Sequence, residues 1–159
     1  MILQNNPPTL VRPAPLIVSR TFPYPREKVF EVWTKAEHFK NWFSPESCSV
    51  PEAEIDFRPG GIFKLCMRVP GEPGHWCIGN FGEIIPLEKI VIDMNLIVGN
   101  IKRFRALTTV TFANEGNNAK MTVHQAYEIF DEEFMHAVEG ATEGWRTTLD
   151  KMERELARI

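Results

Sequence analysis

The chain has 159 residues, of which 43% are hydrophobic and 25% charged, and it carries a net charge of −3. This length suits one domain of about 100–200 residues, and the mildly acidic balance argues against a nucleic-acid partner or an anionic membrane surface. No apolar run approaches the ~18 residues of a membrane span, so no transmembrane segment is predicted.

The first fifteen residues hold four prolines and show no apolar periodicity. This composition predicts a flexible arm over residues 1–15 and a folded domain over residues 16–159. The arm also lacks the basic start and apolar core of a secretory signal. We therefore expect a cytoplasmic protein.

A strand and two short helices are predicted next. Residues 16–24, LIVSRTFPY, alternate well enough for a strand, and Pro25 then opens a helix because proline suits the first helical position. A second short helix is expected over residues 36–43. Its apolar side chains follow the spacing i, i+3, i+4 of a helix face and are Phe39, Trp42 and Phe43.

After the second helix, the spacing of apolar residues changes from about 3.6 residues to 2 residues. A spacing of 2 is typical of strands. Six further strands are expected around residues 53–57, 63–69, 76–85, 90–96, 105–113 and 119–127. With the first strand they make about seven, and the short turns between them favour an antiparallel meander.

Gly60 and Gly61 lie between two of these strands, in the stretch FRPGGIFKL. A phosphate-binding loop joins a strand to a helix, so that the helix N-terminus meets the anion. The two glycines are therefore interpreted as a tight hairpin.

The last predicted element is one long helix over residues 131–159 with an acidic N-terminal cap. Its apolar residues recur every three or four positions and form one stripe, made of Phe134, Val138, Ala141, Trp145, Leu149, Met152 and Leu156. Such a stripe must be buried against another element, for which the sheet is the obvious partner.

Four segments in this order resemble a known family: RTFPYPREKVFEVWTKAEHFKNWF, DFRPGGIFKL, IGNFGEIIPLEKIV and EGATEGWRTTLDKME. They are similar to the C-terminal domain of the activators of the heat-shock protein 90 ATPase, within the START and polyketide-cyclase superfamily (SRPBCC). The resemblance implies an α+β helix-grip fold, in which a curved antiparallel sheet of six to seven strands wraps around a long C-terminal helix. It also implies a cavity for an apolar molecule. Compared with the eukaryotic activators, we expect this chain to differ by not having their separate N-terminal chaperone-binding domain.

The candidate ligand-binding residues are mostly aromatic side chains on elements expected to converge between sheet and helix. They are Trp33, Trp42, Phe43, Phe63, Met67, Trp76, Phe81, Ala141 and Trp145. Trp42 and Phe43 are placed to act as a lid. Gly140 and Gly144 each cost about 1 kcal/mol relative to alanine in a helix interior. Together with Ala137 and Ala141 they form a group of small residues, which indicates either close packing of the helix on the sheet or space left for a ligand.

No catalytic residue is identified, and neither a metal site nor a cofactor is predicted, because the four histidines lack metal-ligand spacing. Cys48, Cys66 and Cys77 are expected to be free thiols. His124 and Gln125 alternate on a strand, so only one of them can face the cavity. The favoured function is binding of a small apolar or amphipathic molecule. The alternatives are an interaction module that contacts a chaperone or forms a homodimer, and a cyclase- or hydrolase-like enzyme.

Overall fold

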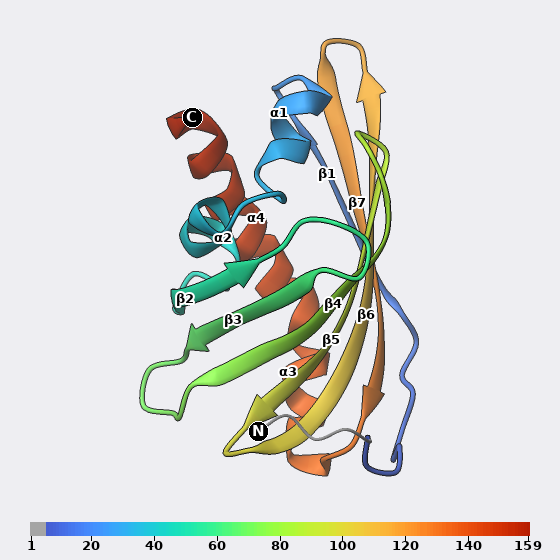
Figure 1. Cartoon of the computed structure of the whole chain (residues 1–159), viewed down its shortest axis with the longest axis vertical. Coiled ribbons are helices and arrows are strands. Elements are labelled where there is room, and N and C mark those ends of the chain that lie inside the picture. The colour runs from blue at the N-terminus through green and yellow to red at the C-terminus, as the bar shows by residue number, and fades with distance from the viewer. Residues whose placement is uncertain (1–5) are drawn as a thin grey trace.

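The computed structural model describes residues 6–159 and contains one strongly curved sheet of seven antiparallel strands (Figure 1). The strands are β1 (Leu16–Phe22), β2 (Ser49–Ile55), β3 (Ile62–Arg68), β4 (His75–Ile85), β5 (Lys89–Val98), β6 (Ile101–Glu115) and β7 (Asn118–Ile129). Their order across the sheet is β1-β7-β6-β5-β4-β3-β2. Strands β2 to β7 thus form the predicted meander, and β1 is added beside β7.

The sheet curves where its strand pairing is irregular. The register shifts between Phe81 and Ile84 in β4 and between Leu96 and Ile97 in β5. At Gly79 the two strands approach so closely that a Cβ atom would lie 1.9 Å from the carbonyl oxygen of Asp93. Bulges and glycines of this kind increase local twist and bending, which gives the sheet a concave face.

Three helices lie on the concave side of the sheet: α1 (Arg26–Glu31), α2 (Ala36–Trp42) and α4 (Ala141–Arg158) (Figure 1). The bulky residues of the predicted apolar stripe lie on α4 and are buried. They are Trp145, Leu149, Met152 and Leu156. The helix-grip arrangement of the α+β class, with two short helices after the first strand, is therefore confirmed.

The C-terminal segment is not the single helix over residues 131–159 that its periodicity predicts. It consists of the 3-10 turn η1 (Glu132–Phe134), the short helix α3 (Met135–Glu139) and the long helix α4. Gly140 separates the two helices with φ −83° and ψ 0°, away from the helical ψ. The expected acidic cap is present, because the Asp131 carboxylate accepts a hydrogen bond from the main-chain N–H of Glu133.

The loop that contains Gly60 and Gly61 joins β2 to β3, as the hairpin interpretation predicts. Gly60 has a φ of +78°, which favours glycine, and a Cβ atom on Gly61 would lie 2.0 Å from the carbonyl oxygen of Asp56. Backbone geometry alone therefore explains both glycines.

A dense aromatic cluster fills the space between α1, α2 and the sheet. Trp33, Phe39, Trp42 and Phe63 are all 0% exposed. The ring centroids of Trp33 and Trp42 lie 4.7 Å apart, and those of Phe39 and Phe63 lie 5.6 Å apart. Edge-to-face pairs of this kind add about 0.5–1.5 kcal/mol each beyond their burial, so this region is solid core.

A buried ionic cluster fastens α2 to α4. The Glu155 carboxylate lies 2.8 Å from Nδ1 of His38, and it accepts hydrogen bonds from Asn41 and from the Arg158 guanidinium. Burial alone would raise the pKa of Glu155, but the hydrogen bonds from Arg158, His38 and Asn41 outweigh burial and lower the pKa to about 2. The carboxylate therefore stays charged at physiological pH.

The described part of the N-terminal arm, residues 6–15, contacts the end of β7. Leu10 N–H donates to the Ile129 carbonyl at 2.8 Å, and Ile129 N–H donates to the Val11 carbonyl at 3.0 Å. Thr9 and Arg12 donate to the Glu128 carboxylate. The division into a flexible arm and a domain from residue 16 stays a prediction, and its first five residues lie outside the described part of the chain. Within residues 6–159, no helix is both long and apolar enough to cross a membrane.

Candidate functional site

A cavity of about 230 Å³ lies between the concave face of the sheet, α3 and the first half of α4. Its lining is mainly apolar and comes from β3 to β7, the loop after α2, and the C-terminal segment. The lining residues are Phe43, Ser44, Pro45, Met67, His75, Cys77, Met94, Leu96, Phe104, Gln125, Tyr127, Phe134, Ala137, Gly140, Ala141, Gly144, Trp145 and Thr148. Ala137 and Gly140 are exposed, so the cavity opens to solvent beside α3.

The nine candidate residues occupy three environments. Phe43, Met67, Ala141 and Trp145 line the cavity. Trp33, Trp42, Phe63 and Phe81 are at most 2% exposed and belong to the adjacent solid core. Trp76 is absent from the lining and half-buried, with Lys64 Nζ 5.4 Å from its ring centroid. Because its neighbour Cys77 lines the cavity, Trp76 points to the opposite face of the sheet.

The small residues of the C-terminal segment border the cavity as a group. Ala137, Gly140, Ala141 and Gly144 all line it. A Cβ atom on Gly144 would lie 3.6 Å from Cγ of Pro45, which is ordinary contact. Larger side chains along this edge would extend into the cavity or against the loop, so the small residues keep the space open.

A cluster of four polar side chains lies at the sheet side of the cavity. Gln125 Nε2 donates to Thr108 Oγ1 at 2.8 Å, while Gln125 Oε1 accepts from Trp145 Nε1 at 3.0 Å and from the Tyr127 hydroxyl. All four side chains are at least nine-tenths buried. Gln125 is therefore the inward residue of the pair that the sequence left open, and His124 is exposed.

The titratable groups beside this cluster remain protonated at neutral pH. Burial, and secondarily Cys66, raises the pKa of the Cys77 thiol to about 12. Burial and the nearby Cys77 also raise the pKa of the Tyr127 phenol. Since the thiolate is the nucleophilic form of cysteine, Cys77 is an inert thiol here.

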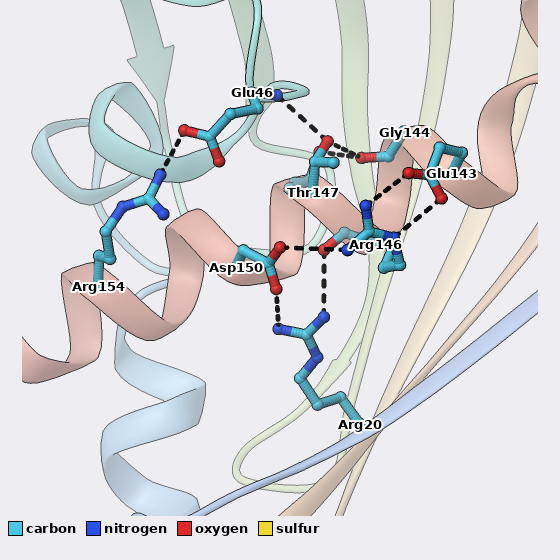
Figure 2. Close-up of polar contacts among 9 residues, drawn as sticks. Arg20, Glu46, Glu143, Gly144, Arg146, Thr147, Asp150 and Arg154 are labelled. Atoms are coloured by element: carbon cyan, nitrogen blue, oxygen red, sulfur yellow. Dashed lines mark hydrogen bonds and ion pairs between the residues drawn. The ribbon is translucent and has the colours of Figure 1, made fainter.

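The loop after α2 closes one side of the cavity and is fastened to α4. Lys151 Nζ donates to Ser44 Oγ and to the Cys48 carbonyl, both at 2.8 Å. Figure 2 shows the neighbouring contacts, in which Arg154 donates to the Glu46 carboxylate and Glu46 N–H donates to Thr147 Oγ1. These contacts hold Ser44 and Pro45 at the cavity wall.

A second set of contacts in Figure 2 fixes the same helix to the edge of the sheet. Arg20 of β1 donates to the Asp150 carboxylate at 2.8 Å and to the Arg146 carbonyl at 3.1 Å. Arg146 in turn donates to Glu143 one turn earlier. The middle of α4 is thus held from both sides by polar contacts.

Metal-ligand geometry is lacking among residues 6–159, where no group of three His, Cys, Asp or Glu side chains could hold an ion. The histidine at the cavity, His75, lies with Nε2 3.0 Å from the Glu72 carboxylate. A second, larger hollow of about 470 Å³ runs between the arm, the end of β7 and α3. Its lining includes Pro13, Pro15 and Glu139, and of the four polar cluster residues it includes Tyr127 but not Thr108, Gln125 or Trp145.

Sequence reasoning missed most of the strand residues that line the cavity, including Cys77, Met94, Leu96, Phe104 and Tyr127. Alternation along β5 to β7 does place the last four of these side chains on the inner face. It gives no indication of how far along each strand the cavity extends, so alternation alone does not identify the lining residues.

Comparisons with solved structures agree with this architecture. An uncharacterized protein from Rhizobium leguminosarum is 26% identical, with a TM-score of 0.81 over 94% of this chain and 99% of that protein. A protein from Nitrosomonas europaea is 23% identical, with a TM-score of 0.74 over 91% of this chain and 94% of that one. An AHSA1 protein from Silicibacter pomeroyi is 21% identical, with a TM-score of 0.75 over 91% and 98% of the respective chains.

Among curated proteins, no match to the chain is found. The family model described as "Activator of Hsp90 ATPase homolog 1-like protein" matches residues 23–157, which span strands β2 to β7, both short helices and nearly all of α4. The chain therefore belongs to the family of Activator of Hsp90 ATPase homolog 1-like proteins.

Proposed function

We propose that this protein binds one small apolar or amphipathic molecule in the cavity between the sheet and the start of α4. The observation that carries the proposal is the change of side-chain size along the C-terminal segment. Leu149, Met152 and Leu156 are buried in packed core, whereas Gly140, Ala141 and Gly144 border open space. A void beside well-packed core forfeits dispersion contacts, and a bound molecule would restore them.

The cavity volume limits the size of the ligand. An engineered cavity of ~150 Å³ accommodates benzene. At the same volume per ligand atom, a cavity of 230 Å³ accommodates about nine non-hydrogen atoms. The favoured ligand is therefore a substituted single ring or a short branched chain, and a sterol or long fatty acid would fit only in part.

An interaction module is the main alternative and would have a filled interior with a large apolar surface patch. Among residues 6–159, the large apolar side chains that are exposed come from the arm and from three different strands, and they are Leu10, Ile17, Ile85, Ile101 and Leu107. Single exposed apolar residues are common on soluble proteins. This distribution supports a binder over a chaperone-contacting or dimer-forming module.

The enzyme alternative requires convergent reactive groups in the cavity. The Cys77 thiol is protonated at neutral pH, its pKa being raised to about 12 by burial, and Ser44 Oγ accepts a hydrogen bond from Lys151. These observations favour binding without turnover.

A dye-displacement titration tests the proposal. An apolar dye that fluoresces when shielded from water should bind with one-to-one stoichiometry and be displaced by small substituted benzenes. Native mass spectrometry of protein purified from its own host should show a retained small molecule as a discrete added mass. Dye binding that no small apolar competitor reverses would instead indicate a surface patch.

A further inference from the structure

The polar cluster at the cavity wall consists of Thr108, Gln125, Tyr127 and Trp145, and its hydrogen bonds fix the orientation of the central amide. Trp145 Nε1 can only donate, and it lies 3.0 Å from the Gln125 side-chain atom assigned as oxygen. The Tyr127 hydroxyl lies against the same atom. With the oxygen so placed, Gln125 Nε2 is directed to Thr108 Oγ1 at 2.8 Å.

The cluster retains hydrogen-bonding capacity of both kinds. Gln125 Nε2 carries two hydrogens, and Thr108 accepts one of them. The Tyr127 oxygen donates its proton to Gln125, while its lone pairs receive no hydrogen bond from residues 6–159. Gln125 and Tyr127 both line the cavity, so one donor and one acceptor remain side by side at its wall.

We infer that the cavity selects a neutral molecule with one hydroxyl group on an apolar body, and that Tyr127 and Gln125 recognise this hydroxyl. A hydroxyl group both donates and accepts. It can therefore donate to the Tyr127 oxygen and accept from Gln125 Nε2, whereas a ketone or ether satisfies only the donor. This inference rests on the proposed binding function.

The rest of the lining excludes charged ligands. No Lys, Arg, Asp or Glu side chain is among the lining residues that the structure describes, and the one lining histidine, His75, already faces the Glu72 carboxylate. A carboxylate or ammonium group inside this cavity would lose hydration without gaining an opposite charge, which is strongly unfavourable. The Tyr127 phenol also stays neutral, because burial raises its pKa.

Binding of an isosteric ligand set tests the inference. 4-Ethylphenol carries the hydroxyl, 4-ethyltoluene replaces it by a methyl group, and 4-methylbenzoate replaces it by a charge. Calorimetry or dye displacement should give the phenol roughly five- to 150-fold higher affinity than the toluene, as expected for two net hydrogen bonds. The benzoate should bind at least about tenfold more weakly than the phenol.

Tyr127→Phe supplies the matched variant, and Tyr24→Phe supplies its control. The chain has only these two tyrosines, and Tyr24 lies outside the cavity with Lys28 Nζ 4.7 Å from its ring centroid. Tyr127→Phe should reduce the preference for the phenol over 4-ethyltoluene by about three- to tenfold, because one of the two hydrogen bonds to the hydroxyl is lost. Tyr24→Phe should leave this preference unchanged.

The outcomes separate this inference from the proposed function. Equal binding of the phenol and the toluene, or a phenol preference that is as large in Tyr127→Phe as in the wild type, would overturn hydroxyl recognition and leave the binding function intact. If none of the three compounds binds and the dye is not displaced, the proposed function itself is wrong.

Discussion

Replacing Ala141 by phenylalanine tests whether the interior beside α4 is open or solid. Ala141 is the first residue of α4 and lines the cavity. A phenyl ring occupies about the volume of benzene, for which a cavity of ~150 Å³ suffices. The new ring would therefore fill about two-thirds of the 230 Å³ cavity and displace any ligand.

The expected change in stability follows from two contributions. Burying a phenylalanine side chain stabilises by about 1.5–3 kcal/mol, and the lower helix propensity of phenylalanine costs about 0.5 kcal/mol. The net gain is about 1–2.5 kcal/mol, which raises Tm by roughly 2–10 °C in a domain of this size. In solid core, overpacking would instead cost about 1–3 kcal/mol.

Thermal melts and a dye titration should be measured on the same preparation of Ala141→Phe. Ala157→Phe provides the control, because Ala157 lies on the same helix but is exposed. Ala157→Phe has the same helix-propensity cost but places no ring in the cavity, so it should bind dye normally. An Ala141→Phe variant that melts several degrees lower and still binds dye like the wild type would refute the cavity.

Three further predictions concern the arm, the ionic cluster and the loop. Deleting residues 1–12 should lower Tm by several degrees, because each of the two lost main-chain bonds to Ile129 contributes about 1 kcal/mol; an unchanged melt would show that the arm adds nothing to stability. Glu155, with an unfolded pKa of about 4.3 and a folded pKa of about 2, stabilises the protein fully above pH ~4.3, and this stabilisation is lost as the pH falls towards 2. The Tm difference between wild type and Glu155→Gln should thus shrink over that range, and a constant difference would contradict the assignment. Lys151→Met should speed dye dissociation in stopped-flow experiments, because the variant loses the bonds to Ser44 and Cys48; an unchanged rate would mean that the loop does not control ligand exit.

The sheet and the second half of α4, with its bulky side chains, were predictable because both follow from the regular spacing of apolar residues along the sequence. Alternation over four or more residues specifies a half-buried strand, and turn residues mark its ends. The break at Gly140 was not predictable in the same way. Its apolar stripe continues across the glycine, and a glycine costs only about 1 kcal/mol in a continuous helix, so the sequence is compatible with either form.

The cavity was predictable as a feature of the fold, but its residues were predictable only in part. In β4, the large apolar residues Trp76 and Ile78 alternate with the small residues Cys77 and Gly79. Hydrophobicity alone favours turning Trp76 inward, whereas the structure places Cys77 at the cavity. The inner face here needs small residues, since Gly79 has no room for a Cβ atom, and this requirement depends on pairing with β5 that a linear pattern does not reveal.

The separation of small and bulky residues along the C-terminal segment has a consequence for how this fold diversifies. Residues that set the volume of the cavity, such as Gly140 and Gly144, lie apart from Leu149, Met152 and Leu156, which anchor α4 to the core. Each carbon atom added at the first group removes roughly 25 Å³ of space, by the same benzene scale, without disturbing the anchor. Under the proposed function, single substitutions at the small residues can therefore change which ligand is preferred without changing the fold.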